Sequence, residues 1–115
     1  MKYFVAILAA IVLPIQAAAT ILPESDAVAI SELVQERLKA HDLNVSFVAE
    51  GKFAIAFWKA ADGHAGGEAL AKKGADDWII VSQTSGTYKA GTLESLGVPK
   101  TQAKALVSDL KAAGQ

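Results

Sequence analysis

The side chains best suited to chemistry lie in a glycine-rich stretch at residues 60–67, Ala-Ala-Asp-Gly-His-Ala-Gly-Gly. Asp62 and His64 stand in this stretch and Glu68 follows it, so one imidazole and two carboxylates lie close together in the sequence. This donor set suits a divalent ion such as Cu(II) or Zn²⁺. A solvated loop histidine is the commoner explanation, because the spacing matches no established metal site. We therefore expect any metal binding to be weak and to depend on His64.

Cu(I) binding and nucleophilic catalysis find little support in the residue types. The chain has no cysteine and its only methionine is the first residue, so a Cu(I) site would lack sulfur ligands. Ser82, Thr84 and Ser85 have no histidine nearby in sequence and belong to no Gly-x-Ser-x-Gly motif. Asp76 and Asp77 fit a tight turn better than acid–base catalysis, because aspartate bonds readily to its own turn backbone. We expect no enzymatic activity.

Large aromatic side chains form the other candidate site. Trp58 and Trp78 each lie in an apolar segment, where a tryptophan usually fills the core, and burial is the favoured interpretation for Trp78. Trp58 has only Ala54 and Ala56 beside it on its face of the expected strand. The alternative is an exposed aromatic patch, in which Trp58 and Tyr88 would bind a protein partner.

Apolar periodicity predicts a sheet flanked by helices. Apolar residues at helical spacing predict a helix from Asp26 to Ala40, with Ser25 or Asp26 as its N-cap. Short apolar segments separated by turn residues then predict strands, of which the one beginning at Phe53 is apolar on both faces and therefore central. These strands are Leu43–Ala49, Phe53–Trp58, Glu68–Lys73 and Trp78–Gln83.

Two further helices are expected after the last strand. Thr92–Gly97 fits one helical turn closed by glycine, and Pro99 suits the first position of a longer helix that Gly114 ends. The expected fold is α+β: an N-terminal helix, a four-stranded antiparallel β-meander, a short helix and a C-terminal helix.

The first residues are typical of a cleavable signal peptide. A basic start at Met1–Lys2 precedes an unbroken apolar run at Tyr3–Leu13, and small residues follow at Ala17–Ala19. The run is shorter than the roughly 20 residues that span a bilayer, although an uncleaved anchor is the alternative. We expect cleavage to remove residues 1–19 and to leave residues 20–115 as one domain. Its expected location is periplasmic or secreted, without membrane insertion.

Charge narrows the choice of partner. Residues 1–19 contain one of the 11 basic residues and none of the 12 acidic ones, so the remaining chain has a net charge of −2. Nucleic acids and anionic membranes are therefore poor partners, since no basic excess attracts them. An exported chain without cysteine must also be held together by packing rather than by disulfides.

The order of features from Ala54 to Leu110 resembles a family of small exported bacterial proteins, the copper uptake system-associated proteins. Members often carry a cysteine at the end of the strand that begins here at Trp78, where this chain has Gln83-Thr84-Ser85. The resemblance implies a setting in copper handling rather than a mechanism. The matching segments are Ala54-Ile55-Ala56-Phe57-Trp58, Gly66-Gly67-Glu68-Ala69-Leu70, Trp78-Ile79-Ile80-Val81, Ser85-Gly86 and Leu96-Gly97-Val98-Pro99, followed by the closing helix.

These observations lead to two functional hypotheses. The first is a non-catalytic exported accessory or binding protein, associated with copper handling in the cell envelope and having an unidentified protein partner there. The alternative is a metal-independent interaction module that uses a sheet edge or an aromatic sheet face. No cofactor is expected beyond weakly bound Cu(II).

Overall fold

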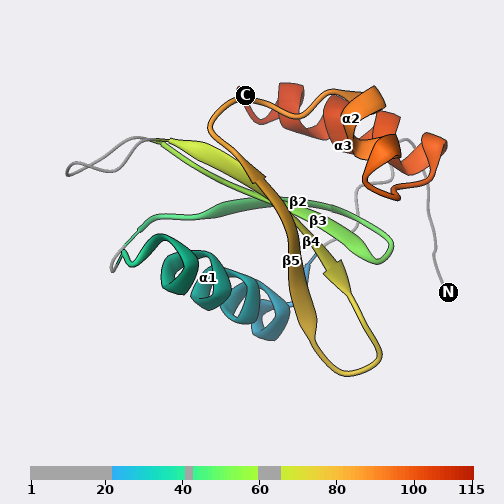
Figure 1. Cartoon of the computed structure of the whole chain (residues 1–115). Helices are drawn as coiled ribbons and strands as arrows, with labels where there is room; N and C mark the ends of the chain where they lie inside the picture. The colour runs from blue at the N-terminus through green and yellow to red at the C-terminus, as the bar shows by residue number, and fades with distance from the viewer. Residues whose placement is uncertain (1–21, 41–42, 60–65) are drawn as a thin grey trace, which may run out of the picture.

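The four strands form one antiparallel sheet in the order β2-β3-β4-β5, so strands adjacent in the sequence are also adjacent in the sheet. Helix α1 covers one face of the sheet, and α2 and α3 cover the other (Figure 1). The predicted α+β fold and the order of its elements are confirmed. The computed structural model describes residues 22–40, 43–59 and 66–115, with α1 (Glu24–Leu38), β2 (Ser46–Glu50), β3 (Phe53–Trp58), β4 (Gly67–Lys73), β5 (Trp78–Thr84), α2 (Ala90–Ser95) and α3 (Lys100–Ala112).

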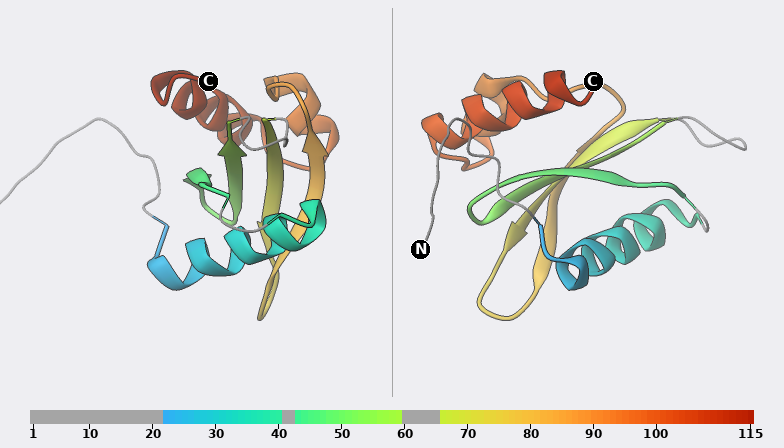
Figure 2. Two further views of the ribbon diagram at one scale, coloured as in Figure 1. Left: turned by 90° about the vertical axis from the view of Figure 1, so that its left-hand side faces the viewer. Right: turned by 180° about the vertical axis from the view of Figure 1, so that it is seen from behind.

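Strand β3 is buried at all six residues because it contributes to a separate core on each face of the sheet. Phe53, Ile55 and Phe57 point toward α2 and α3 and pack with residues such as Leu106. The alternate residues of β3, ending with Trp58, pack against α1. The sheet is therefore the middle of three layers, as the two views in Figure 2 show. The expected central position of this strand is confirmed.

Proline residues occupy the N-cap positions of α1 and α3, which differs from the prediction. Helix α1 starts at Glu24 rather than Asp26, and Pro23 rather than Ser25 or Asp26 occupies the N-cap position. Its carbonyl accepts a hydrogen bond from Ala27 N at 2.9 Å, and no side chain caps the helix. Pro99 likewise precedes α3 instead of forming its first residue. The fixed φ of proline, −58° at Pro23, suits a residue immediately before a helix as well as the first residue within it.

Strand β5 contains a bulge that local sequence patterns do not indicate. Leu70 pairs with Ser82, but the next residue of β4 pairs with Ile80, so Val81 is the extra residue of β5. Ile80 packs on the α1 side of the sheet, whereas Val81 packs on the α3 side. Strand β2 also begins later than expected, at Ser46 rather than Leu43, and β5 extends one residue further, to Thr84.

The C-terminal helices pack as one unit on the sheet. Helix α2 begins two residues earlier than expected and ends before Gly97, whose φ of 105° glycine adopts without strain. Val98 N donates to Leu93 O at 3.0 Å and closes this turn. Within the described part of the chain, no helix has the length and apolar character needed to cross a membrane.

Candidate functional site

A groove lies between α1 and the edge strand β5. It consists of two adjoining hollows of about 430 Å³ and 350 Å³. The larger hollow is lined by Ala29, Glu32 and Asp77, and the smaller one by Arg37 and Ile80. From the larger hollow to the smaller one, the lining residues move toward the C-terminal end of both α1 and β5. The groove therefore runs along the strand. Both hollows share Leu33, Glu36, Trp78 and Ile79.

The alternation of β5 explains the apolar character of this groove. Trp78 and Ile80 point toward α1, while Ile79 points away from it and lies opposite Lys72 of β4. Ile79 is 56% exposed, because the β4–β5 turn extends beyond α2 and α3 (Figure 1). The buried Trp78 indole Nε1 makes no hydrogen bond to the described residues. The groove therefore has an apolar floor, and the exposed side chain of Ile79 lies beside it on the other face of the edge strand.

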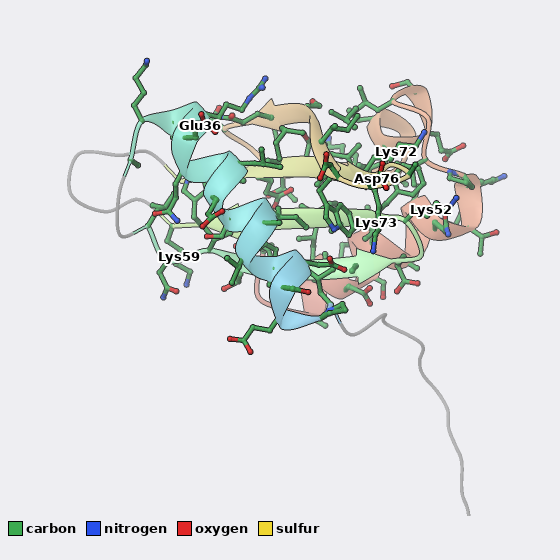
Figure 3. All side chains as sticks on the ribbon, turned by 90° about the horizontal axis from the view of Figure 1, so that it is seen from below. Glu36, Lys52, Lys59, Lys72, Lys73 and Asp76 are labelled. Atoms are coloured by element: carbon green, nitrogen blue, oxygen red, sulfur yellow. The ribbon has the colours of Figure 1, made fainter. Side chains whose placement is uncertain are left out.

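Charged side chains surround the groove unevenly. Glu32, Glu36 and Asp77 line it, whereas Arg37 lies at the far end, where its Nε donates to Gln83 Oε1 at 3.1 Å. Figure 3 shows Glu36 on α1, well separated from Lys52, Lys72 and Lys73, which gather with Asp76 at one end of the sheet. Of these three lysines, Lys73 is paired with Asp26 at 3.5 Å.

Of the three candidate metal ligands, only Glu68 lies within the described residues. Asp62 and His64 lie outside the described residues. Glu68 is completely buried in β4, where its Oε1 accepts from Tyr88 N at 2.8 Å and its Oε2 accepts from Gln115 Nε2 at 3.0 Å. Both carboxylate oxygens are thus engaged within the fold. Within residues 22–40, 43–59 and 66–115, no three histidine or acidic side chains gather in a way that could hold a metal ion.

The two aromatic candidates for partner binding lie in different cores. Trp58 belongs to the core under α1 and Tyr88 to the core under α2 and α3, and each is only 4% exposed. Burial also raises the pKa of the Tyr88 hydroxyl, although contacts with Ser82 and the Leu70 backbone oppose the increase. Neither side chain offers exposed aromatic surface in this structure. Trp78 is buried as expected.

A carboxyl pair links the sheet to α3 on the opposite face from the groove. Burial raises the pKa of Glu50, at the end of β2, from 4.5 to about 7. Asp109 of α3 adds to this increase through its contact with protonated Glu50 and through its negative charge. Asp109 Oδ2 is buried and has no hydrogen-bond partner among the described residues. This pair was not identified from the sequence, because 59 positions separate the two residues.

Sequence reasoning also missed the residues that build the groove. Glu32 and Glu36 lie within the predicted helix, but their position beside β5 depends on how α1 packs. The signal that could have indicated the site is Ile79, an apolar residue between two others in a strand that could lie at the edge of the meander. Only the first and the last strand of a meander lie at the edges of its sheet, so the choice of an edge strand was limited to these two.

Comparison with known proteins adds no family assignment: no protein-family model, curated protein or solved structure matches this chain.

Proposed function

We propose that this chain is a non-catalytic, exported binding protein that holds a protein partner along the groove between α1 and β5. The observation that carries the proposal is the exposed Ile79 on an edge strand, beside an apolar groove with a charged rim. Apolar surface of this kind, bordered by charged side chains, is typical of protein interaction sites. The signal-like residues 1–19 support export.

The shape of the groove favours a polypeptide over a small molecule. It follows β5 along the strand, and the outer side of an edge strand has backbone groups free to pair with an added strand. The described residues contribute no strand beyond β5. The bulge at Val81 interrupts the regular spacing of these groups, so side-chain contacts must contribute to binding together with a short run of backbone pairing.

Site-specific photo-cross-linking tests this proposal. A photoreactive amino acid replaces Ile79 in the exported protein, and a second variant carries it at Lys111, an exposed position of α3 away from the groove. We expect a cross-linked partner polypeptide from position 79 and not from position 111. Equal cross-linking from both positions, or none from position 79, would contradict the proposal.

Association with copper handling is the second candidate function. It is supported by the family resemblance and by the presence of Asp62 and His64 in the glycine-rich stretch. Glu68 is not counted among the ligands, because both of its carboxylate oxygens accept hydrogen bonds within the fold. Calorimetric titration with Cu(II), and with Cu(I) under reducing conditions, tests this function directly. Cu(II) binding that His64→Ala removes would support it, and the absence of binding by either ion would reject it.

A further inference from the structure

We infer that the groove between α1 and β5 accepts an extended polypeptide segment in which basic residues alternate with apolar ones. This inference rests on the proposed function and names the class of partner that the groove recognises. It follows from three features of the groove: the charge of its rim, the spacing of its carboxylates and the placement of its apolar side chains.

The rim is acidic along most of its length. Glu32, Glu36 and Asp77 line it, and the first two are exposed on α1. The nearby cation Lys73 is already paired with Asp26. Arg37 is the one basic residue lining the two hollows described here, and it lies at the far end beside Gln83. A basic segment is therefore the complementary partner, and an acidic segment would meet like charges.

The spacing of the two glutamates matches that of an extended chain. Glu32 and Glu36 are four residues apart on α1, which places their Cα atoms about 6 Å apart along the helix axis. Alternate residues of a strand point to the same side and are about 7 Å apart. Helix α1 runs alongside β5 at the groove. An added strand beside β5 can therefore direct two alternate side chains at the carboxylates of Glu32 and Glu36.

The apolar surfaces fit the same alternating pattern. The aliphatic stems of lysine or arginine can cover Leu33 and Trp78 on the floor while their charged ends reach the glutamates. The intervening residues of the segment then point to the opposite face of the sheet, where Ile79 is exposed. Apolar residues at these positions would cover Ile79.

Fluorescence anisotropy with blocked synthetic peptides of seven residues, the length of β5, tests the inference. One peptide alternates lysine and valine, a second contains the same residues in two separate blocks, and a third alternates glutamate and valine. The purified protein should bind the alternating lysine peptide at least about fivefold more tightly than the other two, as expected for two solvent-exposed ion pairs. Raising the salt concentration to about 0.5 M should weaken this binding.

Variants of the protein locate the binding. Replacing both Glu32 and Glu36 by glutamine should weaken binding of the alternating lysine peptide about fivefold, and the matched control Glu94→Gln on α2 should leave it unchanged. Ile79→Ser should also weaken it. Because all four residues are exposed, the variants should remain folded.

The outcomes separate this inference from the proposed function. Binding of all three peptides with equal affinity, still reduced by Ile79→Ser, would overturn the basic class of partner and leave the groove as the binding site. Binding of no peptide, together with no cross-linking from position 79, would reject both. A dimer of this chain that Ile79→Ser dissociates would overturn the inference, because the occupant would be a second copy.

Discussion

The backbone N–H of Tyr88 donates a 2.8 Å hydrogen bond to Oε1 of Glu68, a carboxylate with no exposed surface. The other oxygen of Glu68 accepts from Gln115 Nε2 at 3.0 Å. Glu68 thereby joins β4 to the loop before α2 and to the residues after α3. These contacts hold the C-terminal helices on their face of the sheet and leave the α1–β5 groove on another side of the molecule.

Removing the Glu68 carboxylate should destabilise the fold. Glu68→Ala leaves the buried Tyr88 N–H without an acceptor, and we expect a loss of about 3 kcal/mol in the free energy of unfolding. Glu68→Gln retains one acceptor oxygen and should cost less, about 1 kcal/mol. Urea unfolding measures both values. The exposed Glu94→Ala serves as control and should change stability by less than about 0.5 kcal/mol. Equal effects at positions 68 and 94 would show that the hydrogen bonds contribute nothing.

The carboxyl pair Glu50 and Asp109 should make stability depend on pH. The pKa of Glu50 in the folded protein, about 7, lies above its ordinary value of 4.5. Its favourable contribution is therefore complete below pH 4.5 and is lost as the pH rises through 7. Glu50→Gln resembles the protonated form, so it should be more stable than the unmodified protein at pH 8 by about 1 kcal/mol, after allowance for solvent screening.

The measurement for this pair is the difference in urea unfolding free energy between the two proteins at pH 4.5 and pH 8. The difference should be near zero at the lower pH and should appear between the two values. Asp109→Asn should lower the pKa of Glu50 and shift the transition to lower pH. A difference that is the same at both pH values would argue against the raised pKa.

Two glycines should respond oppositely to alanine. A Cβ atom at Gly67 would lie 2.7 Å from Thr84 O and 3.0 Å from the Trp58 ring, so the backbone of β5 must shift. Gly67→Ala should therefore cost about 1–3 kcal/mol. A Cβ atom at Gly91, within α2, meets nothing within 4 Å, and Gly91→Ala should stabilise the protein by about 0.5–1 kcal/mol. Thermal unfolding of both variants tests this contrast.

Ile79→Ser should separate binding from stability. The Ile79 side chain is mostly exposed, so its loss should change the free energy of unfolding by less than about 0.5 kcal/mol. A buried neighbour on the same strand provides the comparison: Trp78→Ala should cost about 3–5 kcal/mol because it leaves a cavity under α1. Chemical denaturation of the two variants measures both effects. A large destabilisation by Ile79→Ser would instead assign this residue to packing.

The elements of this fold could be predicted from local patterns, because each depends on neighbouring residues. The apolar character of Phe53–Trp58 on both faces indicated a central strand, and the structure covers both faces with helices. The turn residues on both sides of Glu68–Lys73 were sufficient for a strand prediction, and the structure has β4 there. Strand and helix ends differed from the prediction by a few residues, as at the starts of α1, β2 and α2.

The candidate sites depend on contacts between distant residues, so the sequence indicated them only in part. Glu68 was considered as a candidate metal ligand, but its hydrogen-bond partners lie 20 and 47 residues away and no local pattern reveals them. The polar and apolar faces of α1 could be assigned, whereas the alignment of Glu32 and Glu36 with β5 arises only when the helix packs on the sheet. The groove could not be predicted from the sequence, because it forms only where α1 packs beside β5.

Amide hydrogen exchange resolved by residue tests the central claim, that the groove between α1 and β5 is the binding surface. In the free protein, amides of the edge strand β5 should exchange faster than those of the central strand β3. Addition of the alternating lysine peptide, or of the partner cross-linked from position 79, should slow exchange in Trp78–Thr84 and in the adjoining part of α1. Protection confined to β2 or α3 would contradict the account.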